Sequence, residues 1–487
     1  MVITRVAPSP TGSMHIGTLK MALYDYALAR KNNGKYFLRI EDTDRNRFVE
    51  GSEQEIIDML KAYGLDYDEF YKQSERLDIY KEHAEKLIES GHAYFCFSTK
   101  EEIDELRKVA NAEHKTFTFR SQFRDMPIEE ARKKIESGEK YVIRQKMPKD
   151  QVIEFNDPVQ GLIKFNSNDI DDTVLLKADG FPTYHLAAMV DDHLMGITHV
   201  FRGIEWLPSA PRHVLLYQAF GWEMPFIIHL SVILDPEGGK LSKRKGSVSA
   251  KGFLDEGYLP EAILNFLMLL GWSPAIDYEH GAKEREIFSL DEFVQMFDLK
   301  DVNKSGPIFN REKLMWFNQK YIQALSLDEL EKRFTDWLKT RLEYKDLTQK
   351  IENLGTGYLR EALKIEQTRI KLLSEIPASI GLFYDYKGGF DLLSVKQTRD
   401  LTKEQISEFF NEFKLELNKY QDDLSDLSHE GWENFVRTYA EGKTLKAGSL
   451  FMALRLAITD SQFSPPLLEV VQILGKKEVI QRIDGYI

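Results

Sequence analysis

Two short segments, far apart in the sequence, carry residue types suited to binding a nucleotide. The first is Pro8-Ser9-Pro10-Thr11-Gly12-Ser13-Met14-His15-Ile16-Gly17-Thr18, and the second is Lys240-Leu241-Ser242-Lys243-Arg244. Gly12 and Gly17 let a ligand approach the backbone closely, and a helix beginning at His15 would present its N–H groups to a phosphate. The lysines of the second segment can reach the same phosphates. Together the segments predict one nucleotide site.

The pair resembles the HIGH and KMSKS signatures of the class I aminoacyl-tRNA synthetases, which activate an amino acid with ATP and transfer it to tRNA. The resemblance implies in-line attack of a carboxylate on the α-phosphorus, which needs positioning and charge neutralisation more than an acid or a base. His15 then fits as a phosphate donor, and Lys243 as the cation that meets the α-phosphate and the leaving pyrophosphate. Gly238, Gly239 and Gly246 predict a loop that closes over ATP.

Two arginines predict that the amino acid has a carboxylate side chain. Arg5 lies in the expected strand before the first segment, and Arg202 ends an expected strand in the second half of the sheet. A guanidinium can hold a carboxylate with two parallel hydrogen bonds. Glu41, at the end of another expected strand, is placed to accept from the α-ammonium group. Tyr184 and Ser9 would add hydroxyl partners.

Over essentially its full length the chain resembles the bacterial-type glutamyl-tRNA synthetase family. The supporting stretches are Arg5-Val6-Ala7-Pro8-Ser9-Pro10-Thr11-Gly12, Arg39-Ile40-Glu41-Asp42-Thr43-Asp44, Pro182-Thr183-Tyr184-His185-Leu186-Ala187, Asp191-Asp192-His193-Leu194-Met195-Gly196 and Arg202-Gly203-Ile204-Glu205-Trp206. The resemblance implies ATP-dependent ligation of L-glutamate to tRNA(Glu) through a glutamyl-adenylate, with Mg²⁺ accompanying ATP.

The same resemblance implies the site residues. The glutamate-binding set is Arg5, Ser9, Glu41, Tyr184 and Arg202. The ATP-binding set is Pro8, Ser9, Thr11, Gly12, His15, Gly17, Thr18, Glu205, Lys240, Ser242, Lys243 and Arg244. Asp44 is implied to lie near the 3′ end of tRNA.

A parallel sheet must position these residues. Apolar residues predict a strand over 2–6, a helix after Gly17 and a second strand over 36–40, and Ser52 with Glu55 predicts a capping box for the next helix. A strand, helix and strand in this order pack as half of a doubly wound nucleotide-binding fold.

The predicted fold class is a multi-domain α/β protein. Residues 1–95 and 181–245 form the two halves of a Rossmann-like catalytic domain, 96–180 an inserted α+β module that grips the acceptor stem, 246–325 a stem-contact region and 326–487 an all-helical anticodon-binding region. Further capping boxes are predicted at Ser289 with Glu292, Ser326 with Glu329, and Thr402 with Gln405.

Composition limits the class of protein. The chain has 487 residues, 43% of them hydrophobic, and its sequence contains no apolar run near the roughly 20 residues of a membrane span. The first strand begins at once, without room for a leader, so we expect a cytoplasmic protein, and we expect a monomer. Cys96 is the single cysteine, which excludes an internal disulfide and argues against a zinc site built on paired thiolates.

The net charge of −13 argues against an RNA partner unless the cations are clustered. Basic residues do gather over 140–149 and 240–245. Gln367 bears on which tRNA is charged: in the resembling family an arginine near this position is typical of enzymes that charge only tRNA(Glu), and a glutamine of enzymes that also charge tRNA(Gln). Charging of tRNA(Gln) as well is therefore a hypothesis.

Four alternatives fit the sequence less well. A glutaminyl enzyme would leave the charges of two arginines unmatched by an amide. A truncated paralogue that modifies a tRNA base would lack the helical tail. A nucleotidyltransferase is disfavoured by the length of the chain, and an inactive RNA-binding module by the intactness of both signatures.

Overall fold

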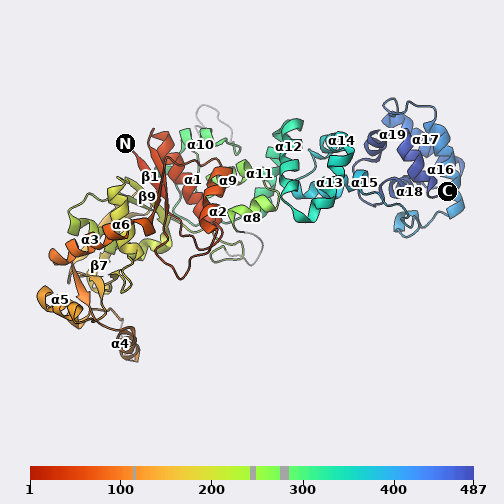
Figure 1. The fold of residues 1–487 in the computed structure, drawn as a ribbon. Helices are drawn as coiled ribbons and strands as arrows, with labels where there is room; N and C mark the ends of the chain where they lie inside the picture. The colour runs from red at the N-terminus through yellow and green to blue at the C-terminus, as the bar shows by residue number, and fades with distance from the viewer. Residues whose placement is uncertain (113–116, 242–247, 275–284) are drawn as a thin grey trace. The chain divides into compact units, whose positions relative to one another are not determined.

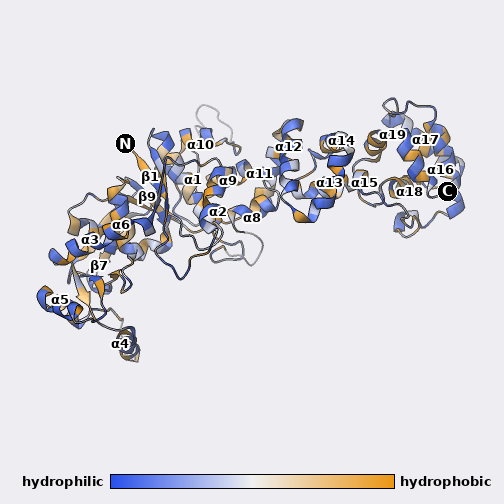
Figure 2. Ribbon diagram, viewed as in Figure 1, coloured by the Kyte–Doolittle hydropathy of each residue, from blue (hydrophilic) through white to orange (hydrophobic). Residues whose placement is uncertain are grey.

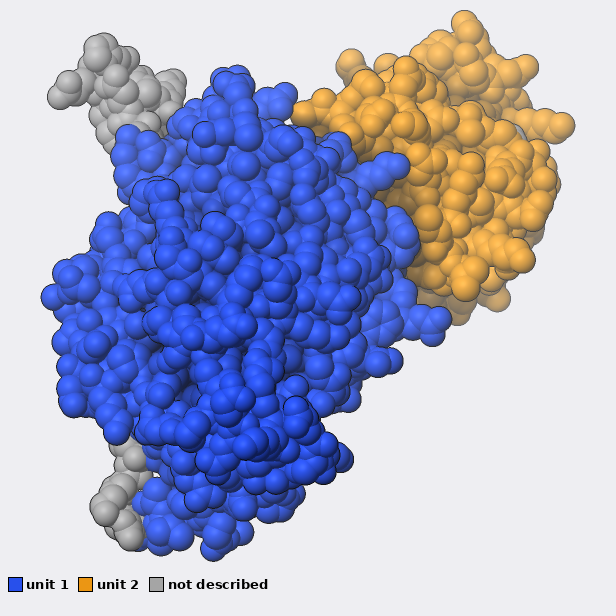
Figure 3. Space-filling view, turned by 60° about the vertical axis from the view of Figure 1, so that its left-hand side comes forward, with its two compact units in different colours: residues 1–254, 260–313 blue, residues 255–259, 314–487 orange. Residues whose placement is uncertain are grey.

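The computed structural model describes residues 1–112, 117–241, 248–274 and 285–487 (Figure 1). The predicted residues Ser242, Lys243, Arg244 and Gly246 lie outside this part of the chain. The chain forms two compact units, coloured in Figure 3. Unit 1 comprises Met1–Leu254 and Pro260–Lys313, and unit 2 comprises Asp255–Leu259 and Leu314–Ile487.

Parallel strands from both halves of unit 1 meet at its centre (Figure 1). β1 (Ile3–Val6) pairs with β2 (Lys35–Ile40), and β2 with β3 (Glu69–Lys72). β9 (His199–Gly203) pairs with β10 (Phe226–Leu230). The backbone N–H of Thr198, just before β9, donates to the carbonyl of Ile3 in β1 at 2.9 Å. The three-stranded and two-stranded sheets thus adjoin in the order 3-2-1-9-10, with a topological switch point between β1 and β9, and the predicted doubly wound fold is confirmed.

Helix α1 (Ile16–Lys31) follows β1 and is buried on most sides. Leu19, Ala22, Leu23 and Ala27 of this helix are buried, whereas Tyr26 is partly exposed. Such a helix suits the interior of an α/β layer because it packs against both the sheet and further helices.

The capping box predicted at Ser52 is wrong. Helix α2 (Ser52–Ala62) has Gly51 as its N-cap, at φ +80°, and no side chain caps it. The Ser52 hydroxyl donates to the carbonyl of Val49 at 2.6 Å, so it is one residue too late to serve as the cap. Glycine adopts this left-handed conformation without steric cost.

Three more helices complete the α/β layers: α3 (Leu77–Glu89), α6 (Tyr184–Leu194) and α7 (Ala210–Phe220). Residues 93–176 contain an antiparallel sheet of β4 (Ala93–Cys96), β5 (Val142–Gln145) and β8 (Val174–Leu176), so the sheet of the insertion begins before the predicted boundary at residue 96. The same stretch contains a hairpin of β6 (Val152–Asp157) and β7 (Gly161–Asn166), and helices α4 (Lys100–Ala112) and α5 (Ile128–Glu136). Cys96 is buried in β4.

The chain that follows the lysine segment returns to the start of α1. The Ile16 N–H donates to the Val248 carbonyl at 2.8 Å, and the Ala250 N–H donates to the Met14 carbonyl at 2.8 Å. These bonds fix the beginning of α1 beside the residues that follow the second predicted segment. The next helices are α8 (Ala250–Asp255), α9 (Pro260–Leu269), α10 (Leu290–Met296) and α11 (Arg311–Ala324).

The regular secondary structure in the described residues of unit 2 is entirely helical. Its helices are α12 (Leu327–Lys339), α13 (Lys345–Leu354), α14 (Gly357–Glu366), α15 (Ile376–Tyr384), α16 (Lys403–Leu417), α17 (His429–Gly442), α18 (Ala447–Thr459) and α19 (Leu467–Asp484). These helices mix apolar and polar residues (Figure 2), and apolar positions such as Leu330 and Phe334 form the core. No helix in the described ranges is long and apolar enough to span a bilayer.

The remaining capping predictions differ in outcome. Complete boxes are present at Ser289 with Glu292 and at Thr402 with Gln405. At Ser326 only half of the box forms: the hydroxyl accepts from the Glu329 N–H at 3.2 Å, but the Glu329 carboxylate accepts from Arg333 at 2.6 Å. The carboxylate finds a cation one turn further along the helix, which competes with the cap.

Candidate active site

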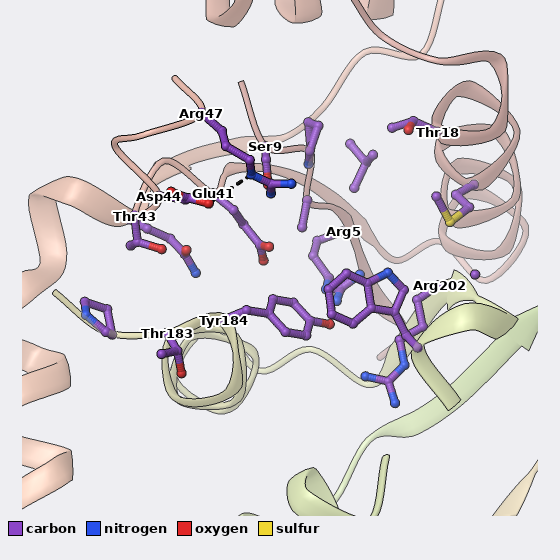
Figure 4. A pocket seen from close by; sticks show the side chains of 18 of the residues that line it. Arg5, Ser9, Thr18, Glu41, Thr43, Asp44, Arg47, Thr183, Tyr184 and Arg202 are labelled. Atoms are coloured by element: carbon purple, nitrogen blue, oxygen red, sulfur yellow. Dashed lines mark hydrogen bonds and ion pairs between the residues drawn. The ribbon is translucent and has the colours of Figure 1, made fainter. Parts of the chain in front are cut away.

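A cavity of about 490 Å³ lies at the carboxyl ends of β1, β2 and β9, at the switch point of the sheet (Figure 4). Open α/β sheets bind their ligands at such points. The five residues predicted to bind glutamate all line it, namely Arg5, Ser9, Glu41, Tyr184 and Arg202. Figure 4 shows the Tyr184 ring extending into the cavity from the start of α6 toward the two arginines.

A buried acidic residue of α6 holds Arg5 in place. The Arg5 Nε donates to Asp192 Oδ1 at 2.9 Å, and the same oxygen accepts from Arg39 Nη1 at 2.7 Å. Arg39 also donates to Glu41 at 3.0 Å. Burial opposes the charge on Asp192, but Arg39 and Arg5 hold its pKa below the usual value. Burial raises the pKa of Glu41. A cation bound in the cavity would therefore stabilise the charged form of this carboxylate.

Arg202 has different partners. Its Nε donates to His229 Nε2 at 2.9 Å, and its Nη1 lies 2.8 Å from His213 Nδ1. Its Nη2 is buried and has no hydrogen-bond partner among the described residues. A buried donor without an acceptor is costly, and a ligand carboxylate in the cavity would supply that acceptor.

Aromatic rings form one wall of the cavity. The Tyr184 ring lies 4.6 Å, between centroids, from the Trp206 ring. Both side chains also line a neighbouring cavity of about 410 Å³, which contains Arg144 and Arg212. The wall therefore separates the arginine cavity from a second cavity, which is lined by both arginines and aspartates.

A cavity of about 210 Å³ lies next to the first. Thr18, Met21 and Gly203 line both, so the two cavities adjoin. Five of the residues predicted to bind ATP line the smaller cavity, namely His15, Gly17, Thr18, Glu205 and Lys240. Lys240 donates to Glu205 at 2.8 Å.

His15 is the N-cap of α1, and its Nδ1 accepts from the Gly17 N–H at 3.0 Å. The neutral ring must then carry its proton on Nε2, which gives the cavity a hydrogen-bond donor. The first turn of α1 contains no acidic residue, so the positive end of the helix dipole is not neutralised locally. Both features favour an anion.

Comparison with known proteins agrees with this geometry. Residues 1–316 match the family model for the catalytic domain of class I tRNA synthetases (E and Q), and residues 329–487 match an anticodon binding domain. The chain is 39% identical to the glutamate–tRNA ligase of Prosthecochloris aestuarii, across 99% of this chain and 97% of that protein, and 40% identical to that of Alkaliphilus metalliredigens, across 99% and 98%.

This chain belongs to the class I glutamate–tRNA ligase family. A crystal structure of the ligase from Elizabethkingia meningosepticum in complex with its amino acid is similar at 36% identity, with a TM-score of 0.83 over 100% of this chain and 99% of that one. The ligase of Elizabethkingia anophelis is similar at 37% identity, with a TM-score of 0.82.

Some residues that were predicted to bind ATP in this ligase do not line the smaller cavity. Pro8 and Ser9 line the arginine cavity instead of the smaller one. Thr11 and Gly12 line neither of the two cavities. Gly12 has φ +125°, which a residue with a Cβ would adopt only with strain, so its place in the motif has a backbone reason.

The two residues predicted to contact tRNA lie in different units. Asp44 lines the arginine cavity and accepts from Arg47 at 2.9 Å. Gln367 follows α14, and its amide nitrogen donates to the carbonyls of Ile322 at 2.9 Å and Leu325 at 2.8 Å. The Gln367 side chain thus satisfies carbonyls at the end of α11.

Several residues that line or support the site were not predicted as site residues, namely Arg39, Asp192, His213, His229 and Trp206. A signal existed for Asp192, because adjacent acidic residues within an apolar helix need buried partners. The histidines gave no such signal, since a lone histidine on an apolar face is ordinarily structural.

Proposed function

We propose that this chain attaches L-glutamate to tRNA(Glu) in two ATP-dependent steps. In the first, a glutamate α-carboxylate oxygen attacks the α-phosphorus of ATP, forming glutamyl-adenylate and releasing diphosphate. In the second, a ribose hydroxyl of the terminal adenosine of tRNA attacks the carbonyl of the mixed anhydride, releasing AMP. The observation that carries the proposal is the shared boundary between an arginine cavity and a cavity at the beginning of α1.

In the arginine cavity the glutamate side-chain carboxylate binds Arg5 and Arg202. Glu41 accepts from the α-ammonium group, and Ser9 and Tyr184 donate or accept through their hydroxyls. These roles follow from charge, because the guanidiniums of Arg5 and Arg202 and the carboxylate of Glu41 line the same cavity.

In the smaller cavity ATP binds with its Mg²⁺, which the phosphates carry. The His15 Nε2–H donates to phosphate beside the positive end of α1, Gly17 and Thr18 line the phosphate space, and Lys240 and Glu205 contact the nucleotide. Lys243 neutralises the charge that develops on the leaving diphosphate. ATP contacts are predicted from the sequence alone for the other motif residues, namely Pro8, Ser9, Thr11, Gly12, Ser242 and Arg244.

The tRNA spans the remaining modules. Asp44 is proposed to meet the 3′ end at the mouth of the arginine cavity, the insertion to hold the acceptor stem, and unit 2 to read the anticodon. A monomer suffices for the chemistry, since one chain lines both cavities. The proposed compartment is the cytoplasm.

Labelled glutamate and separate transcripts of tRNA(Glu) and tRNA(Gln) test the function directly. Charging of tRNA(Glu) that depends on ATP and glutamate is expected. A chain that binds tRNA(Glu) yet charges neither transcript would be an inactive RNA-binding protein, and the proposal would be wrong.

Charging of tRNA(Gln) as well is a second proposal that rests on Gln367 alone. Its amide nitrogen is engaged by Ile322 and Leu325, so only its side-chain oxygen is left to accept from a base. If Gln367 permits tRNA(Gln), Gln367→Arg should abolish charging of that transcript and keep tRNA(Glu). Gln367→Ala is the matched control for loss of the two carbonyl contacts.

A further inference from the structure

Arg202 is held by histidines rather than by a carboxylate. The guanidinium donates to His229 and His213, both fully buried, and itself is only 5% exposed. Arg5 and Arg39 contrast with it, because both share a carboxylate oxygen of Asp192. No acidic side chain of the described residues forms an ion pair with Arg202.

Neighbouring groups fix which nitrogen of each histidine accepts. The Nδ1 of His229 lies 2.7 Å from Asp157 Oδ2, so this nitrogen donates and Nε2 is left to accept from Arg202. Asp157 is itself fixed, because the backbone N–H groups of His229, Val159 and Gln160 donate to it at 3.0, 2.7 and 2.9 Å.

The second histidine is ordered in the same way. Since the Nδ1 of His213 accepts from Arg202, its proton sits on Nε2, which lies 3.0 Å from His185 Nδ1. His185 can accept there only if it is neutral. A chain of defined donors and acceptors therefore runs from Asp157 through His229, Arg202 and His213 to His185.

All three rings favour the neutral form. Burial, and next the charge of Arg202, place the pKa of His213 well below its usual value. Burial lowers the pKa of His185 to about 4. The pKa of His229 is lowered by burial, although Asp157 opposes the shift.

We propose that His213 and His229 are positioning residues that orient Arg202 without neutralising it, so that its positive charge selects a substrate carboxylate over an amide. A carboxylate in place of either ring would orient the guanidinium equally well but would compensate its charge before substrate arrived. The buried Nη2 without a partner is the donor that this arrangement leaves for the substrate. The inference rests on the proposed function, in which Arg202 binds the glutamate side chain.

An isosteric pair of variants tests charge separately from shape. His213→Gln keeps a neutral acceptor for Arg202, whereas His213→Glu has nearly the same shape and adds a compensating negative charge. We expect H213Q to keep the KM for glutamate within about threefold of the wild type, and H213E to raise it by at least about tenfold while KM for ATP changes little. H213E should also reduce the preference for glutamate, measured as kcat/KM for glutamate divided by kcat/KM for free L-glutamine.

His199→Gln is the matched control. His199 lies on β9, the strand that carries Arg202, but contacts Thr198 and Phe226 instead of Arg202. His229→Gln tests the second positioning histidine independently. Circular dichroism shows whether each variant is folded. Equal KM values for glutamate in H213Q and H213E, or an equal rise in KM for ATP in H213E, would overturn the proposal. Absence of glutamate charging by the wild-type chain would instead refute the proposed function.

Discussion

Arg5 is one of two arginines that share a buried oxygen of Asp192. Arg5→Ala should raise the KM for glutamate, because it removes a guanidinium from the cavity and leaves Asp192 with Arg39 alone. Truncating one member of a buried charged pair costs about 2–5 kcal/mol. Steady-state aminoacylation at varied glutamate measures the change, and an unchanged KM would remove Arg5 from the binding site.

Buried neutral histidines make stability depend on pH. In the unfolded chain a histidine takes up a proton near its ordinary pKa of about 6.5, but in the folded chain the pKa values of His185, His213 and His229 are lowered. Below about pH 6.5 the unfolded state therefore binds more protons, and stability is lost as pH falls, by up to about 1.4 kcal/mol per pH unit for each histidine.

Urea unfolding at about pH 7 and 5.5 checks this expectation. The carboxylates of Asp157 and Asp192 titrate well below that window, since their pKa values are lowered. His213→Gln should make the free energy of unfolding less dependent on pH. An undiminished pH dependence in this variant would show that His213 is not neutral in the folded chain.

At the scale of elements, the beginning of α1 combines a cap with an anion site. His15→Ala removes the acceptor for the Gly17 N–H, which should cost about 0.5–2 kcal/mol of stability, and it removes the proposed phosphate donor, which should lower kcat. His15→Asn restores a good N-cap. Thermal unfolding together with kcat separates the two roles: H15N should recover stability but not the full rate.

The positions of helices and strands could be predicted where the sequence pattern is local. The contacts between distant segments could not. The strand at β1, the helix at α1 and the boxes at Ser289 and Thr402 follow from nearby residues. The box at Ser52 was wrong because glycine at the preceding position provides the turn.

The contacts within the site needed the folded chain. Arg5 and Arg202 could be singled out by type, since guanidiniums suit a carboxylate. Their partners Asp192 and His229 could not, because such contacts join segments distant in sequence and depend on which strands become neighbours. The lysine segment at Lys243 was predicted from its motif and lies outside the described residues.

For the whole molecule, a net charge of −13 means that only local cations can hold tRNA. The KM for tRNA should therefore rise steeply between about 50 and 200 mM KCl as counterions compete, whereas the KM for glutamate, which makes far fewer ionic contacts, should change much less. Aminoacylation at both salt concentrations measures the two dependences. Equal dependences would indicate that tRNA is held mainly by contacts other than phosphate.

Cys96 gives the chain a practical property. It is the single thiol of 487 residues and is 1% exposed within β4, so reagents in solution should react with it only slowly. A cysteine introduced at one exposed position in each unit would then provide the two readily labelled thiols of the protein. A pair of fluorescent dyes on them would follow the separation of the two units, in real time, while the enzyme binds, charges and releases tRNA.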